Sequence, residues 1–226
     1  MGFKNVHPAQ ELQANAATRQ LLLNAAAEIF AERGFRAASI REICTRAGAN
    51  VAAVNYHFGD KEGLYLEVLK NTLRCTREKH PPDMGLKPGA SAQEKFRAFV
   101  HSFLLRIFDT EPQACHGKLL AREMVEPTAA LDALVEAEMR PMSAQLQKIV
   151  RQLLGKTASD KTVRLCTMSV VSQIVFYHHC RPVIERLHPE LRFTPSDIER
   201  LADHISSFSL GAIKGLVGKS NRVKPL

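Results

Sequence analysis

Apolar residues recur at every third or fourth position along most of the chain, which is the pattern of amphipathic helices. The spacing, together with glycine, proline and capping residues, predicts helices over 18–34, 39–47, 50–58, 60–80, 91–107, 115–125, 127–154, 160–180 and 194–217. Pro141 lies inside the seventh of these and should kink it near Ala137. We therefore predict an all-α protein.

The stretch from Ser39 to Lys61 predicts two short helices separated by a tight turn. Ser39 and Glu42 have the spacing of a capping box, so each side chain can accept a backbone N–H at the start of a helix. Gly48 permits the positive φ at which that helix must end, and Asn50 can cap the next helix three residues later. This is the layout of a helix-turn-helix, whose second helix enters a DNA major groove.

An ordinary corner between two helices has the same turn, so the outward positions of the second helix must distinguish the two interpretations. They include no acidic residue. Val51, Ala52 or Ala53 could contact a thymine methyl group, and Asn55 could make a bidentate contact to adenine. The composition of this face favours the DNA-binding interpretation.

Three further residues suit contacts to phosphate rather than to bases. Tyr56 and His57 can donate to phosphate oxygens, which fixes the register without reading the sequence. Asp60 can cap the following helix, and Lys61 in its first turn could hold a phosphate together with the helix N-terminus.

The run from Thr18 to Tyr65 resembles the N-terminal domain of the TetR family of bacterial transcriptional regulators. The resemblance rests on AAAEIFAERGF at 25–35, on 39–43, on Ala47-Gly48, and on the segments YHF at 56–58 and KEGL at 61–64. It implies a three-helix DNA-binding head on a larger helical domain that dimerises and usually binds a small molecule. By position, the implied DNA contacts are Ser39, Arg41, Val51, Ala52, Ala53, Asn55, Tyr56, His57 and Lys61.

The pattern and the resemblance together give a domain organisation. We expect a flexible N-terminal segment at 1–17, a DNA-binding domain at 18–64, a ligand-binding and dimerisation domain at 65–217, and a basic flexible tail at 218–226. The helix at 60–80 would belong to both domains, so a shift of the larger domain should move the head.

The segment from Leu119 to Leu134, with Cys180-Arg181-Pro182, resembles the corresponding part of CecR-like regulators. Arg122, Glu123 and Glu126 are charges on an otherwise apolar helix. Arg122 and Glu126 could form an i,i+4 ion pair, which we favour, or the charges could anchor an inducer in an apolar cavity. The candidate ligand-binding residues, any of which could instead be structural, are Arg106, Arg122, Glu123, Met124, Met168, Phe176, Tyr177 and His178.

Charge and composition narrow the function further. The 226 residues carry a formal charge of +8, but residues 1–80 hold eleven Lys and Arg against eight Asp and Glu, only +3. DNA binding must therefore depend on where the charges lie. No membrane span or signal peptide is expected, which favours a cytoplasmic protein.

We expect no cofactor, no metal site and no catalytic activity. Gly155-Lys156-Thr157 imitates the end of a phosphate-binding loop, but Val150 stands where that motif requires its first glycine. The five cysteines include no C-x-x-C pair, and adjacent His178 and His179 point about 100° apart on a helix.

The last two helices carry apolar residues on more than one face, which indicates burial against both the core and a partner. In the resembling family they pair into a four-helix dimer interface, so two heads would read a palindromic operator. The chain is thus predicted to be a ligand-responsive repressor. Two alternatives remain open: the same fold triggered by a thiol or a metal, and a small-molecule-binding protein without DNA function.

Overall fold

A computed structural model describes residues 8–109 and 116–220 of the chain, and these form helices and turns with no strand. The predicted all-α class is confirmed. The chain divides into two compact units. The head unit comprises Met1–Arg74 and Thr110–Val135, and the body unit comprises Cys75–Asp109 and Glu136–Leu226. In the described residues no helix has both the length and the apolar character that a membrane span needs.

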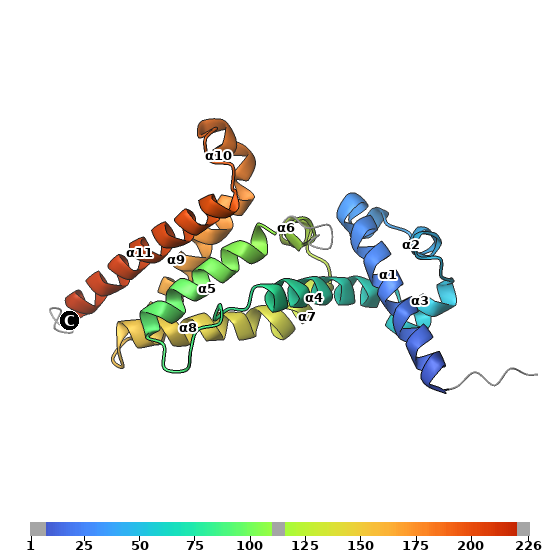
Figure 1. The fold of residues 1–226 in the computed structure, drawn as a ribbon, viewed down its shortest axis with the longest axis horizontal. Coiled ribbons are helices and arrows are strands. Elements are labelled where there is room, and N and C mark those ends of the chain that lie inside the picture. Colours follow the sequence, from blue (N-terminus) through green and yellow to red (C-terminus); the bar gives the residue numbers. More distant parts are fainter. Residues whose placement is uncertain (1–7, 110–115, 221–226) are drawn as a thin grey trace, which may run out of the picture. The chain divides into compact units, whose positions relative to one another are not determined.

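The head unit is built around α1 (Pro8–Ala37), α2 (Ile40–Ala47), α3 (Val51–Phe58) and the first part of α4 (Lys61–Lys79), with α6 (His116–Val125) and α7 (Ala130–Leu134) (Figure 1). Its core contains one face of α1, where Leu22, Ile29 and Phe30 have no exposed surface. Gly34, with φ 78°, interrupts α1, and the Phe35 ring lies 6.2 Å from that of Phe30. Helix α1 starts at Pro8, so part of the predicted flexible segment is helical.

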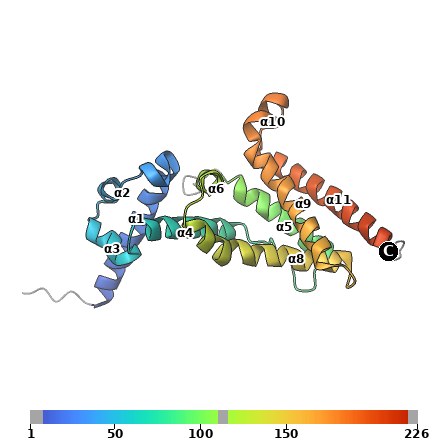
Figure 2. The same ribbon diagram turned by 180° about the vertical axis from the view of Figure 1, so that it is seen from behind.

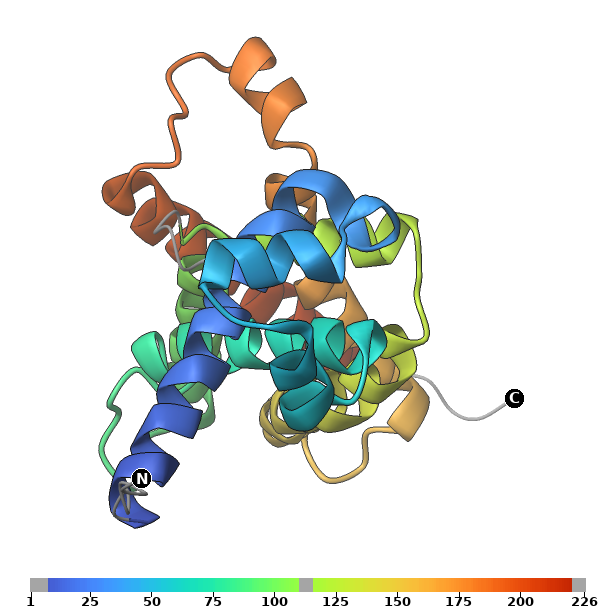
Figure 3. The ribbon, with the colours of Figure 1, turned by 90° about the vertical axis from the view of Figure 1, so that its right-hand side faces the viewer.

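The body unit contains α5 (Ala92–Ile107), α8 (Arg140–Leu154), α9 (Asp160–His179), α10 (Arg181–Leu187) and α11 (Pro195–Ser220) (Figure 2). Helix α5 packs against α8, α9 and α11, and its Phe96, Phe99 and Leu104 are buried. Figure 3 shows α10 and the loop that returns to α11 standing out from the other helices of this unit. The predicted start of α6 at Cys115 and the tail residues 221–226 lie outside the described residues.

The single helix predicted over 127–154 is instead three elements. Helix α7 ends at Leu134, a π-helical turn covers Val135–Met139, and α8 follows from Arg140. The proline ring at 141 cannot donate a hydrogen bond and would crowd the carbonyl of Ala137, and a π turn removes that conflict. The predicted position of the irregularity is confirmed, although its form was predicted as a kink.

Two capping arrangements in the body unit begin the helices that were predicted over 91–107 and 194–217. The Ser91 backbone N–H donates to Glu94 at 2.7 Å, and the Glu94 N–H donates to the Ser91 hydroxyl at 3.2 Å. At α11 the Thr194 N–H donates to Asp197 at 3.0 Å, and the Asp197 N–H donates back to the Thr194 hydroxyl at 3.3 Å. These reciprocal bonds satisfy donors that a helix N-terminus leaves open. Helix α10 was not predicted, because its apolar pattern spans only seven residues.

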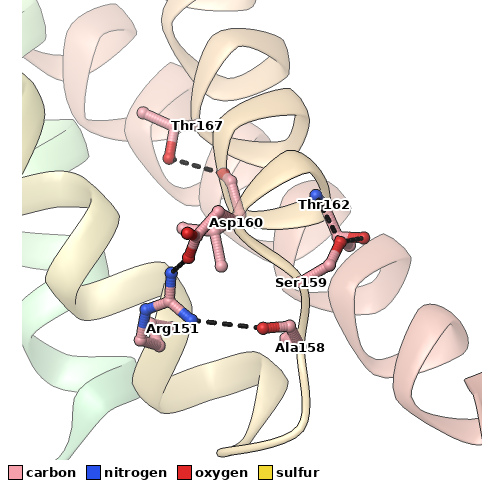
Figure 4. Close-up of polar contacts among 7 residues, drawn as sticks. Arg151, Ala158, Ser159, Asp160, Thr162 and Thr167 are labelled. Atoms are coloured by element: carbon pink, nitrogen blue, oxygen red, sulfur yellow. Dashed lines mark hydrogen bonds and ion pairs between the residues drawn. The ribbon is translucent and has the colours of Figure 1, made fainter.

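The segment that imitates a phosphate-binding loop is the turn between α8 and α9 (Figure 4). Gly155 ends α8 with φ 92°, and the Arg151 guanidinium donates to the Ala158 carbonyl at 3.2 Å and pairs with Asp160 (Figure 4). The Ser159 hydroxyl accepts the Thr162 N–H at 3.1 Å and so caps α9. The turn joins two helices, as the missing first glycine indicated.

Candidate nucleic-acid interface

The turn between α2 and α3 holds the two helices by backbone and capping bonds. The Gly48 N–H donates to the carbonyls of Cys44 and Thr45 from a left-handed conformation, φ 63° and ψ 29°. The Asn50 side chain accepts the Ala53 N–H at 2.8 Å and starts α3. The geometry of a helix-turn-helix is therefore present where the sequence predicted it.

At the start of α2 only one half of the predicted capping box forms. The Ser39 hydroxyl accepts the Glu42 N–H at 3.3 Å. The Glu42 carboxylate, however, lies 2.9 Å from the guanidinium of Arg33 on α1. A cation from another helix competes successfully for this carboxylate, because a charge-assisted contact is stronger than a neutral one.

Helix α3 is anchored by one fully buried residue, and about half of its residues are exposed. Val54 is fully buried, whereas the Tyr56 side chain is 75% exposed and Val51 is 43% exposed. Ala52 and Asn55 are also exposed, and Ala53 and His57 are partly buried. The residues predicted to contact bases thus lie on an accessible, acid-free face.

The basic residues around this face differ in whether they already form an ion pair within the protein. Arg46 lies 3.4 Å from Glu28, and Arg33 pairs with Glu42. Arg41 and Ser39 are exposed, and within the described residues the Arg41 guanidinium has no ion-pair partner. A guanidinium without an internal carboxylate remains available to a phosphate.

Asp60 lies in the connection between α3 and α4, and Lys61 is the first residue of α4. The Asp60 carboxylate accepts the Gly63 N–H at 2.7 Å, which confirms the predicted cap of α4. The Lys61 amine donates to the Arg36 carbonyl at 3.3 Å and lies 4.8 Å from the centre of the Phe35 ring. It therefore also fixes α4 against the end of α1.

The charged residues of α6 have partners that the sequence analysis missed. The Glu123 carboxylate is 1% exposed and accepts hydrogen bonds from the Tyr65 hydroxyl at 2.9 Å and from the Thr128 N–H at 2.7 Å. The Arg122 guanidinium donates to the Glu32 carbonyl at 3.4 Å, and no ion pair joins it to Glu126 in the described residues. The favoured i,i+4 pair is therefore wrong.

A pocket of about 250 Å³ lies beside this cluster in the head unit. It is lined by Phe35, Arg36, Glu62, Tyr65, Pro127, Thr128, Ala129 and Ala130. None of the predicted ligand-binding residues lines it, and no sequence pattern indicated it, because its walls come from three separate segments.

The other predicted ligand-binding residues range from buried to exposed. Arg106 is 6% exposed, whereas Met124, Met168 and Phe176 are 43%, 60% and 55% exposed. Tyr177 and His178 are partly buried, and burial, with nearby His179 and Arg181 as smaller causes, lowers the pKa of His178. No group of three His, Cys, Asp or Glu within the described ranges is placed to hold a metal ion.

Comparisons with known proteins decide the family. The sequence model described as bacterial regulatory proteins of the tetR family matches residues 22–68. The model described as the C-terminal domain of the HTH-type transcriptional dual regulator CecR matches residues 92–213, more than half of the chain. The chain belongs to the TetR family of bacterial regulators.

Individual relatives agree. The HTH-type transcriptional dual regulator CecR of Shigella flexneri is 28% identical over 179 residues, covering 76% of this chain and 79% of CecR. The HTH-type transcriptional repressor NicS of Pseudomonas putida is 24% identical over 206 residues, covering 88% of this chain and 92% of NicS. These relatives make this TetR-family protein a DNA-binding transcriptional regulator and not an enzyme.

Solved structures show the same fold. The TetR-family regulator PfmR of Thermus thermophilus superposes with a TM-score of 0.58 at 18% identity, covering 84% of this chain and 93% of PfmR. A transcriptional regulator from Rhodococcus sp. Rha1 gives a TM-score of 0.62 at 18% identity, covering 86% of this chain and 96% of that regulator. The TetR-family architecture of head and helical body is thus shared at low sequence identity.

Proposed function

We propose that this TetR-family protein is a homodimeric repressor that binds a palindromic operator and releases it when a small molecule binds the body unit. The proposal of DNA binding rests on α3, a helix that is anchored by Val54 and whose exposed face contains no acidic residue. Two such helices about 34–36 Å apart would enter successive major grooves of one duplex.

An exposed apolar surface on α9 and α11 supports the homodimer. Leu165, Met168 and Phe176 are 54%, 60% and 55% exposed, and at 100° per residue they fall within about 80° of one another around α9. Phe208 and Leu216 of α11 are 63% and 41% exposed. We call these five residues the apolar face. Gln173 of α9 donates to Ser209 of α11 at 3.2 Å, so the two helices lie side by side.

Repression follows from simple occupancy, since a dimer bound across an operator excludes other proteins from it. A ligand can reverse this only if it binds the released conformation more tightly than the DNA-bound one. The proposed mechanism is therefore a shift of population between two states of the dimer.

The DNA contacts can be tested by fluorescence anisotropy with duplexes from the region upstream of the chain's own coding sequence. Asn55→Ala should cost about 1–3 kcal/mol at one base position and relax the choice there, because a bidentate amide contact is lost. Lys61→Ala should weaken all duplexes alike and reduce the slope of log affinity against log salt by about 1. Circular dichroism must first establish that Lys61→Ala retains its helices.

Lys70→Ala and Asn71→Ala are matched controls on α4, outside the predicted interface, and should leave both affinity and selectivity unchanged. If Asn55→Ala and Lys61→Ala respond alike across altered operators, the assignment of base and phosphate contacts is wrong. If the wild-type protein shows no salt-sensitive, sequence-selective binding, the alternative of a small-molecule-binding protein without DNA function gains support.

A thiol trigger is the second candidate, and one observation bears on it. Cys166 is partly buried, and burial raises the pKa of its thiol, which lowers the fraction of the reactive thiolate. A Cys166→Ser, Cys180→Ser double variant should therefore keep its response to ligand. Loss of an oxidant response in that variant, with DNA binding intact, would favour the thiol trigger instead.

A further inference from the structure

Arg106 is a buried cation in the last turn of α5. Its side chain is 6% exposed and lies in the apolar core of the body unit. The guanidinium carbon is 5.2 Å from the centre of the Phe103 ring, and one terminal nitrogen, Nη1, lies 3.4 Å from the Met142 sulfur. An arginine in such surroundings is rare unless it is paired.

The hydrogen bonds of Arg106 leave much of its donor capacity unused. Nε donates to the Ser102 carbonyl at 3.3 Å, and among the residues that the structure describes Nη1 has only the thioether of Met142, a weak acceptor. Within residues 8–109 and 116–220, the other terminal nitrogen, Nη2, is buried and has no hydrogen-bond partner. A positive charge in the last turn of a helix interacts favourably with the helix dipole without being buried. That role does not explain why the whole guanidinium is buried.

The neighbouring carboxylates are already paired with other cations. Asp109 lies 2.9 Å from Lys79 and 3.5 Å from His80, and Glu138 lies 2.6 Å from Arg77. Burial lowers the pKa of Arg106 to about 10, with a smaller contribution from Arg77, so the guanidinium is still charged at neutral pH. The body unit therefore holds one buried positive charge without a matching carboxylate from the described residues.

We propose that Arg106 binds the carboxylate of an organic effector, with the apolar part of that effector packed against Phe103 and Met142. The inference rests on the proposed ligand response and specifies its chemistry. A planar carboxylate matches the fork of a guanidinium and supplies the strong acceptors that Nη1 and Nη2 lack. Met142 is the side chain that must yield, and its flexible thioether can adopt another rotamer at little cost.

The test uses two pairs of probes that differ in charge but hardly in shape: benzoate with benzamide, and octanoate with octanamide. Binding to the full-length protein is measured by isothermal titration calorimetry. At least one carboxylate should bind the wild type more tightly than its amide. Arg106→Met should weaken that carboxylate about tenfold or more, because hydrogen bonds to a charged group are lost. Arg106→Lys keeps the charge but not the planar fork of donors, so its affinity for the carboxylate should lie between those of the wild type and Arg106→Met.

Arg97→Met is the matched control, because Arg97 is on the same helix with a 47% exposed side chain. It should leave carboxylate affinity unchanged. Thermal unfolding without ligand gives a second reading. Since an unpaired buried charge destabilises a fold, Arg106→Met should unfold at the same temperature as the wild type or higher.

Four results would overturn the proposal: no carboxylate binds the wild type, amides bind as well as carboxylates, Arg106→Met binds as the wild type does, or Arg106→Met unfolds at a clearly lower temperature. The last would assign Arg106 a structural role. Operator binding by the wild type without any carboxylate tests the proposed function separately. Operator binding can be absent while calorimetry shows carboxylate binding, and carboxylate binding can be absent while the operator is bound.

Discussion

Glu123 of the head unit has a carboxyl group that is almost completely buried. A carboxyl group with 1% exposure is tolerated only when hydrogen-bond partners replace the lost water, and here Tyr65 and the backbone and hydroxyl of Thr128 do so. Burial, and then the hydrogen bond to Glu123, raise the pKa of Tyr65, so its hydroxyl stays protonated and remains a donor. The cluster ties α4 to the segment after α6.

Tyr65→Phe tests this cluster, since it removes one donor and leaves the carboxylate buried. We expect the free energy of unfolding in urea to fall by about 1–3 kcal/mol, the usual cost of an unsatisfied buried polar group. Tyr56→Phe, at a position 75% exposed, is the control and should change stability by less than about 0.5 kcal/mol. Equal stability of the two variants would mean that water or a rotated Thr128 replaces the lost donor.

For single residues, the sequence predicted which side chains are buried better than it predicted which side chains they contact. The helical period predicted amphipathic helices, and apolar residues of these helices such as Leu22, Ile29 and Val54 have no exposed surface. It could not assign Glu123 to Tyr65, which is 58 positions away in the chain. Local rules favoured Arg122 with Glu126 because they see only neighbours within one turn.

Elements whose ends are set by nearby residues were predicted well. The capping box of Ser91 and Glu94 and the turn at Gly48 depend only on residues a few positions apart. Only one of the two hydrogen bonds of the capping box at Ser39 forms, because the Glu42 carboxylate pairs with Arg33 of α1. Tertiary ion pairs of this kind leave no local pattern from which they could be predicted.

The start of α4 depends on a glycine for a reason unrelated to backbone freedom. A Cβ on Gly63 would lie 2.1 Å from the carbonyl oxygen of Phe58, at the end of α3. No rotamer relieves that contact, because the backbone fixes the position of a Cβ and the oxygen is itself a backbone atom. The angle at which α4 leaves the helix-turn-helix is therefore set by the absence of a side chain.

Gly63→Ala should consequently shift α4 away from α3 and destabilise the head unit by about 1–3 kcal/mol, the usual cost of overpacking. Operator affinity should fall with it, because the shift displaces the neighbouring interface residues. Urea unfolding and anisotropy on the same preparation measure both. Glu62→Ala, at the exposed neighbouring position, is the control and should change stability by at most about 1 kcal/mol. A Gly63→Ala protein with wild-type stability and affinity would disprove the close approach.

The chain enters the head unit twice, through Met1–Arg74 and again through Thr110–Val135. Helix α6 packs on α1 there, and Arg122 donates to the Glu32 carbonyl 90 positions earlier. Periodicity predicts that α6 is a helix but not which helix it packs against. The division of the whole molecule follows from such long-range contacts, and the sequence carries no direct sign of them.

The apolar face on α9 and α11 allows the homodimer to be tested with one substitution. Phe176→Glu places a carboxylate on this face, and in a two-fold symmetric interface each dimer then buries two of them. Burying an unpaired charge costs about 3–5 kcal/mol, so the dimer dissociation constant should rise about 100-fold or more. Sedimentation equilibrium measures it, and operator affinity should fall in parallel because a single head contacts only one half-site.

Val125→Glu is the matched control, since Val125 is 77% exposed on α6 of the head unit, outside the apolar face. It adds the same charge and should leave the dimer intact. If Phe176→Glu also remains dimeric, the interface lies elsewhere and the exposure of Leu165, Met168 and Phe208 needs another explanation. If it becomes monomeric yet binds the operator with unchanged affinity, one head suffices for recognition, and the palindromic part of the proposal is wrong.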